Sequence, residues 1–388
     1  MKFEINEKVM KNILEKAVAA IDKKSSIDTL KRLYFEVKEN SLEVMVYNYN
    51  TGTMQLKVYT DIFNVDRKNG KFAIHVDDVS IITKMKDTIT MYIEDEKLCI
   101  KSGKKKMNIP LYEYTETEIE PSQIGKEENL LNIPCNEFLE TCSSLSIFAE
   151  KESPNELLNV IKLDGKNSRM IALDGHRMAI KHLKDEYIAE NNIVGDVMLH
   201  VYTVPILKKL INKKDSSSLS ISFDGKYIVL RNNEFELIIK NVEGAYFKVD
   251  QMLVDNGKGQ SFVCNRTELL NIMKYDYDIC KKEEKKLVIF YQSNGNMNVY
   301  CKTSRYECVD TLETEESYIQ DKFMIGFNPK FYVDALEIVK DEKINIEFSK
   351  PKYPAFINTE EYTFLLLPVN IDCSKDSKVA KCVEKAIA

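Results

Sequence analysis

The feature of this chain that most constrains its fold is an internal repeat, present three times with a period near 130 residues. A short apolar segment, an asparagine and a helical pattern follow one another at Asn6, Asn136 and Asn265, at intervals of 130 and 129 residues. Each asparagine is a candidate N-cap, because its side-chain oxygen can accept from a free amide of the first helical turn. Self-similarity at a fixed period indicates one structural unit built three times.

A second helical pattern recurs in phase, from Ile74, Leu199 and Ile325. Between the two helices of each copy, apolar and polar residues alternate around a turn rich in Asn, Gly and Asp, which predicts a β-hairpin. These hairpins cover residues 33–47, 158–173 and 286–301. Longer alternating stretches begin at Thr88, Ser218 and Lys343 and predict further meanders.

We therefore predict an α+β fold of three repeated domains, each with two helices against β-meanders. The predicted domains are residues 1–125, 126–254 and 255–371, followed by a C-terminal extension, 372–388. Polar stretches around Pro121 and Gly257 fall at the joins and are typical of linkers. The extension is predicted to be a short helix or a frayed tail.

Composition excludes some classes of protein and leaves others open. No apolar run approaches the roughly 20 residues that span a bilayer, and the start of the chain lacks a signal-peptide pattern, so we expect an intracellular protein. The nine cysteines form no CxxC pair, which argues for reduced thiols and against structural zinc. The net charge of −6 does not by itself indicate a nucleic-acid partner, but phosphate binding needs only a local basic face.

Repeated domains that pair strands edge to edge can close into a ring, which leaves no exposed edges. If helices line the hole, their outward faces should be basic. The first helix offers Lys8 and Lys11 opposite an apolar stripe of Met10, Ile13, Leu14 and Ala17, and the second helices add further lysines. Taken singly, each lysine is more simply explained as solvating a helix face; the recurrence in three copies favours the hypothesis of a basic lining.

Three segments resemble the bacterial DNA polymerase III beta subunit family, the beta sliding clamps: Met170–Ile180, the sequence IGFNPKFYVDAL from Ile325, and Thr363–Ile371. The resemblance covers residues 1–371. It implies clamp-type domains that close as a head-to-tail homodimer into a six-domain ring around double-stranded DNA. It also implies a non-catalytic, cytoplasmic processivity factor for DNA replication, with no cofactor or metal. Its expected partners are the polymerase III catalytic subunit, a clamp loader and other proteins carrying short clamp-binding motifs.

The resemblance also implies three sets of site residues. An apolar slot for a partner's peptide motif is expected at Leu158, Leu173, Gly175, His176, Arg177, Met178, Phe247, Gln251, Met252, Asn328, Phe331, Leu365, Leu366, Leu367, Pro368 and Val369. Nonspecific DNA contacts are expected from Lys8, Lys11, Lys24, Lys84, Lys151, Lys208, Lys209 and Lys330. The dimer interface is expected at Met107, Ile109 and Ile279, with Lys104–Lys106 facing Glu283 or Glu284.

Some positions depart from the family pattern. Gly244–Phe247, with Gln251 and Met252 after it, replaces a segment that usually presents Pro and Arg, which predicts altered motif selectivity. Asn370 replaces a penultimate Arg, and Asp77 stands where a basic residue is expected. The extension after Ile371 could cover the peptide slot or tether another molecule.

Two other classes of function, an enzyme and a peptide-binding hub, compete with the clamp interpretation. Asp174 and His176 could form an acid–base pair or bind a metal, but no third member accompanies them, and a lone histidine in a turn is more often structural. The segment Asn256–Ser261 lacks the spacing of a phosphate loop and is better interpreted as linker. A clamp paralogue, possibly carried by a phage or plasmid and acting as a peptide-binding hub, stays open as the alternative function.

Overall fold

The computed structural model describes residues 1–48, 54–66, 69–114, 125, 127–189, 197–254, 259–372 and 378–387. It divides into two compact units, residues 1–143 with 184–243, and residues 144–183 with 244–388. Each unit holds strands from two neighbouring repeats, and the three predicted domain boundaries stay a prediction. Residues 115–124 and 255–258 of the predicted linkers lie outside the described residues. The ends of both stretches, Glu128–Asn129 and Gln260–Ser261, are the first residues of strands. None of the helices described is long and apolar enough to cross a membrane.

The first unit is built on two antiparallel sheets. One has the order β5-β1-β7-β8-β9 and the other β10-β15-β16-β17-β4-β3-β2-β6. The strands of these sheets are β1 (Lys2–Asn6), β2 (Arg32–Lys38), β3 (Ser41–Asn48), β4 (Met54–Asp61), β5 (Phe63–Asp66), β6 (Gly70–His75), β7 (Thr88–Glu94), β8 (Lys97–Ser102), β9 (Lys105–Pro110), β10 (Glu128–Pro134), β15 (Ser218–Phe223), β16 (Tyr227–Arg231) and β17 (Phe235–Lys240). A further strand of this unit, β14 (Val197–His200), belongs to neither sheet.

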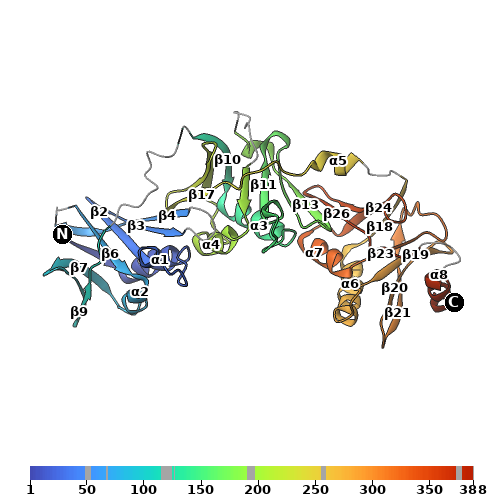
Figure 1. The fold of residues 1–388 in the computed structure, drawn as a ribbon, viewed down its shortest axis with the longest axis horizontal. Helices are drawn as coiled ribbons and strands as arrows, with labels where there is room; N and C mark the ends of the chain where they lie inside the picture. The colour runs from blue at the N-terminus through green and yellow to red at the C-terminus, as the bar shows by residue number, and fades with distance from the viewer. Residues whose placement is uncertain are drawn as a thin grey trace. The chain divides into compact units, whose positions relative to one another are not determined.

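The helices of this unit bear out the predicted pattern. Met10, Ile13, Leu14 and Ala17 are buried on one face of α1, and α1 packs against both α2 and α4 (Figure 1). The helices are α1 (Glu7–Val18), α2 (Val76–Ile82), α3 (Cys135–Leu145), most of which belongs to this unit, and α4 (Thr203–Leu210). Two short 3₁₀ turns are η1 (Asp28–Lys31) and η5 (Asp185–Tyr187).

The asparagine caps are confirmed at two of the three predicted positions. Asn6 accepts from the amide of Lys8 at 2.9 Å, and Asn265 accepts from Thr267 at 2.9 Å. The prediction for Asn136 is wrong, because α3 begins one residue earlier, at Cys135. The amides of Cys135 and Asn136 donate to backbone carbonyls of Ser217 and Asp215, at 2.9 and 2.8 Å, so these first-turn groups need no side-chain cap.

The second unit is also built on two antiparallel sheets. One contains the run β11-β12-β13-β26-β25-β24-β18-β22, and the other has the order β21-β20-β19-β23. The strands are β11 (Val160–Asp164), β12 (Arg169–Leu173), β13 (Arg177–His182), β18 (Gln260–Asn265), β19 (Val288–Ser293), β20 (Asn296–Lys302), β21 (Glu307–Leu312), β22 (Thr314–Glu315), β23 (Met324–Phe327), β24 (Lys343–Phe348), β25 (Ala355–Asn358) and β26 (Tyr362–Leu366).

An aromatic core joins α7 to these sheets. Phe290 lies 5.2 Å from Tyr332 and 5.8 Å from Phe348, measured between ring centroids, and all three side chains are buried. Such pairs add stability beyond the burial of apolar area. The helices are α5 (Val249–Val254), α6 (Arg266–Cys280), α7 (Pro329–Ile338) and α8 (Lys378–Ile387), with 3₁₀ turns η3 (Glu156–Leu158) and η4 (Gly165–Asn167).

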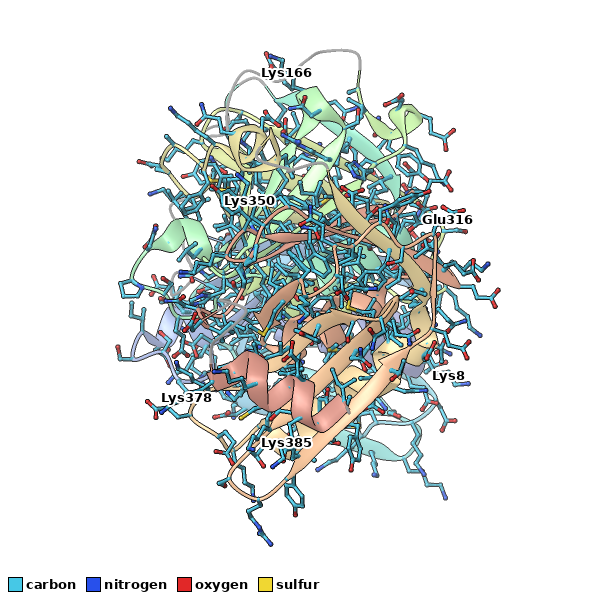
Figure 2. The ribbon with its side chains drawn as sticks, turned by 90° about the vertical axis from the view of Figure 1, so that its right-hand side faces the viewer. Lys8, Lys166, Glu316, Lys350, Lys378 and Lys385 are labelled. Atoms are coloured by element: carbon cyan, nitrogen blue, oxygen red, sulfur yellow. The ribbon has the colours of Figure 1, made fainter. Side chains whose placement is uncertain are left out.

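The C-terminal extension contains one of the two predicted forms, a helix. Ala380 and Val383 of α8 pack against Tyr291, Tyr300 and Met324, so α8 covers the β19–β23 sheet (Figure 1). Figure 2 shows Lys378 near the start of α8 and Lys385 near its end. The expectation that the extension could cover the peptide slot therefore fails for α8, because its apolar face is committed to this sheet.

Candidate functional site

A tight turn between β12 and β13 organises the predicted peptide slot. The Asp174 carboxylate accepts from the amides of His176 at 2.9 Å and Arg177 at 3.0 Å. Gly175, between them, has a φ of +85°, a conformation that strains residues with a Cβ. The Asp174–His176 pair that suggested acid–base chemistry is thus part of a structural turn.

Arg177 is the centre of the slot's charged network. Its guanidinium pairs with Asp174 at 2.9 Å and Asp334 at 2.5 Å, and it donates to the carbonyl of Ile147 at 2.8 Å. The same group lies 4.8 Å from the ring centroid of Phe148 and 4.9 Å from that of Phe331. These contacts fix α7 against the start of β13. Sequence reasoning missed Phe148 and Asp334, although Asp334 lies in a segment used for the family resemblance.

The terminal strand β26 pairs with β13, with Leu365 opposite Met178 and Leu366 opposite Arg177. After β26, the amide of Leu367 donates to the carbonyl of His176 at 2.9 Å. Leu365 and Leu366 are buried, whereas Leu367 is 37% exposed and Pro368 and Val369 are half-buried. The strand therefore supplies both a buried support and an exposed apolar rim.

The other predicted slot residues also divide into buried residues that support the surface and residues that are partly or fully exposed on it. Leu173 and Met178 face each other across β12 and β13 and are buried, so they support the surface from below. Leu158, at the end of η3, is half-buried, as is Phe331, whose ring lies 6.4 Å from that of His176. Asn328 caps α7 by accepting from the amide of Lys330 at 3.0 Å.

The divergent segment around α5 is held by a separate set of contacts. Asp250 of α5 pairs with Arg169 at 2.6 Å, and Lys162 lies 5.2 Å from the ring centroid of Tyr246. These contacts run to β11 and β12 and do not involve Arg177. On this segment Phe247 is half-buried, and Gln251 and Met252 are exposed.

The predicted DNA-binding lysines of the first unit lie on exposed surface. Lys8 and Lys11 are on the outer face of α1. This helix contacts α4, which carries Lys208 and Lys209, and α2, which ends just before Lys84. The remaining exposed lysines of this set are Lys24, Lys84, Lys208 and Lys209. The carboxylate of Asp77, in the first turn of α2, lies 3.2 Å from Nδ1 of His75, and the amide of Asp77 donates to the same nitrogen at 3.3 Å.

In the second unit the two predicted lysines differ. Lys151 is exposed. Lys330 forms an ion pair with Asp334, the same carboxylate that binds Arg177, so its charge is already compensated within α7.

The predicted interface residues lie on or beside strands that end their sheets. Met107 and Ile109 are on β9, at one end of its sheet, with Met107 half-buried and Ile109 buried. Ile279 is half-buried on α6, which packs against β21, the end strand of another sheet. The Glu283 carboxylate accepts from the hydroxyl of Ser304 at 3.0 Å, close to β21.

Solved structures of DNA polymerase III beta subunits have this fold. A putative beta subunit from Eubacterium rectale matches with a TM-score of 0.80 and 22% identity, over 96% of this chain and all of that one. The beta subunit of Streptococcus pyogenes matches with a TM-score of 0.83 and 18% identity, over the same shares. The chain therefore has the sliding-clamp fold, with its helices and many antiparallel strands.

Sequence comparison identifies the relatives. Residues 263–367 match the family model of the DNA polymerase III beta subunit, C-terminal domain. The beta sliding clamp of Lactococcus lactis is 21% identical over 375 residues, covering 90% of this chain and 92% of that protein. The chain is similar to bacterial DNA polymerase III beta subunits over nearly its whole length, and the resemblance predicted from its sequence is confirmed.

Proposed function

We infer that the chain is a DNA sliding clamp, which encircles duplex DNA and tethers the replicative polymerase without catalysing a reaction. The chain matches almost the whole length of proteins named beta sliding clamps. Processivity of this kind comes from topology, so a clamp needs weak, nonspecific phosphate contacts that permit sliding.

The observation that carries the proposal is the way strands join neighbouring repeats. β4, the third strand after the first helix of its repeat, pairs with β17, the last strand of the next repeat. β13 and β26 hold the same two positions in the second and third repeats, and they pair as well. The same type of junction is thus used twice within one chain.

One strand of each kind is left over. The equivalent third strand of the last repeat is β21, and the last strand of the first repeat is β9. Each ends its sheet among the described strands. Exposed strand edges favour pairing with another chain. We propose that β21 of one copy pairs with β9 of a second, which joins two three-domain chains head to tail in a six-domain ring.

The charges on these two edges are complementary. β9 carries Lys105 and Lys106, whereas β21 carries Glu307 and Asp310. Opposite charges on facing strands stabilise the strand pair modestly, whereas like charges that face each other destabilise it. β9 with β21 is therefore preferred over β9 with β9.

For DNA, we propose the lysines exposed on and beside α1, α2 and α4 as the sliding surface.

For partners, we propose the surface rimmed by Leu158, His176, Phe331 and Leu367, which would accept the leucine and aromatic side chain of a short motif. Each such side chain, when buried, contributes about 1.5–3 kcal/mol. Selectivity for the motif would come from the divergent α5 segment. The site of action would be the cytoplasm, at replication forks.

The test is the solution mass by light scattering over a concentration series, followed by retention on nicked circular DNA after loading. We expect a mass of two subunits, and retention that is lost when the circle is linearised. A chain that stays monomeric at high concentration would exclude closure through these edges.

A further inference from the structure

A cluster of thiols and one carboxyl group lies beneath β21, between that strand, β20 and α6. Cys301 of β20 and Cys308 of β21 face each other in register across the antiparallel pair. Asp276 and Cys280 lie on α6, four residues apart, which places them on the same face of the helix. The protein thus brings four metal-ligating side chains together from three elements that are far apart in the sequence.

Three of the four ligand atoms of this cluster are close to one another. One carboxylate oxygen of Asp276 and the sulfurs of Cys301 and Cys308 lie within 4.8 Å of each other. The Cys308 sulfur is 3.3 Å from Oδ1 of Asp276. Cys280 lies outside this group of three; its thiol interacts with that of Cys301 and is the nearest candidate for a fourth ligand. In a tetrahedral zinc site, with Zn–S bonds of about 2.3 Å, ligand atoms are separated by roughly 3.8 Å. Small side-chain movements would therefore bring these atoms to ligand positions.

Asp276 points to a missing ligand. Its side chain is 0% exposed, and no described residue hydrogen-bonds to its Oδ2 atom. A buried carboxyl oxygen without a partner is costly, so such atoms are rare in folded proteins. A bound cation would satisfy it. A disulfide between Cys301 and Cys308 would leave this oxygen and the Cys280 thiol without a new partner.

We propose that Asp276, Cys280, Cys301 and Cys308 bind a thiolate-preferring divalent cation of the zinc class. Three sulfur ligands and one oxygen ligand suit zinc and disfavour magnesium or calcium, which take oxygen ligands. Cys308 is only half-buried and gives the cation a route in. The site would cross-link α6 to the free edge strand β21 and stiffen that edge.

The sequence predicted no metal site, because its cysteines lack paired spacing. Cys301 and Cys308 are separated by a hairpin rather than by the two residues of a CxxC motif. Their proximity depends on the register of β20 with β21 and on the packing of α6, neither of which cysteine spacing reveals.

The experiment is a cobalt(II) titration of the full-length chain, reduced and stripped of metal. We expect one equivalent to give thiolate-to-cobalt absorption in the near ultraviolet and the intense visible bands of a tetrahedral site, with zinc displacing the cobalt. Cys301→Ser and Asp276→Asn should each weaken binding at least tenfold. Cys382→Ser, which removes an exposed thiol on α8, is the matched control and should bind as the parent chain does. If Cys301→Ser does not fold, Cys308→Ser at the sheet edge takes its place.

Each of three outcomes would overturn the proposal. One is a folded parent chain that gives no thiolate-to-cobalt band. Another is a band that survives both Cys301→Ser and Cys308→Ser. The third is a reduced chain that binds no cobalt but forms a Cys301–Cys308 disulfide in air, which would make the cluster a redox pair. Cobalt binding is measured without DNA, so its failure leaves the clamp proposal standing, and the reverse also holds.

Discussion

Glu236 of β17 lies opposite Lys57 of β4, with the Lys57 ammonium 3.2 Å from Oε1 of Glu236. The other carboxylate oxygen of Glu236 lies 2.7 Å from the guanidinium of Arg231. The lysine and the carboxylate are both largely buried and come from neighbouring repeats. This ion pair therefore lies in the strand junction on which the ring proposal rests.

The junction ion pair predicts a pH-dependent stability. Burial alone raises the pKa of Glu236, but Lys57 and Arg231 outweigh it and hold that pKa below the usual 4.5. A carboxyl group whose folded-state pKa is lowered stabilises the fold above pH 4.5, and this contribution is lost as the pH falls through the folded-state pKa. We expect Glu236→Gln to lower the free energy of unfolding by about 1–3 kcal/mol at pH 7. In urea titrations the difference in the free energy of unfolding between the parent chain and Glu236→Gln should become smaller below pH 4.5. A gap that stays constant with pH would show that the charge of Glu236 does not stabilise the junction.

Ring closure through β9 predicts that dimerisation depends on this edge of the sheet and not on the opposite edge. Met107→Asp places a charge on β9 and should give a monomer by light scattering, because an unpaired buried charge is costly. Phe63→Asp is the control, since Phe63 is 50% exposed on β5, the strand at the other end of the same sheet. The control should stay dimeric. Monomers from both variants, or dimers from both, would contradict closure through β9.

The basic surface predicts a loss of DNA retention without a loss of partner binding. The triple change of Lys8, Lys11 and Lys208 to Glu should shorten retention on circular DNA and reduce its dependence on salt, because fewer phosphate contacts remain. The matched control changes three exposed lysines elsewhere, Lys166, Lys350 and Lys378, which Figure 2 labels. Equal loss in the two triple variants would mean that overall charge, and not this surface, holds the DNA.

The peptide slot predicts an effect of Leu367→Asp on affinity alone. Leu367 is exposed, so the change should leave the fold intact and weaken a motif peptide containing Gln, Leu and Phe by about 2 kcal/mol, roughly thirtyfold. Leu173 is a poor target, because it is 5% exposed and a charge there would disturb the core. The control is Tyr318→Asp, at a residue 69% exposed in the same unit. Unchanged affinity in a calorimetric titration of Leu367→Asp would refute the slot assignment.

The sequence predicted most of the elements, because the repeat supplied three independent views of one pattern. The hairpins, the second helices and the terminal strand are where alternation and helical periodicity placed them. Features that depend on neighbouring segments were missed or wrong. The start of α3 is set by the carbonyls of Asp215 and Ser217, far along the chain. The pairing of Lys330 with Asp334 shows how a lysine suggested for DNA is used within its own helix.

The two internal strand junctions have a kinetic consequence. β4–β17 and β13–β26 join segments of one chain, so each re-forms after breaking at an effective concentration of roughly millimolar, however dilute the protein. A β9–β21 junction would join separate molecules and would have no such advantage. A closed ring would therefore open at the junctions between chains, because only these would dissociate on dilution. To admit DNA, a loader would have to hold just one of them apart.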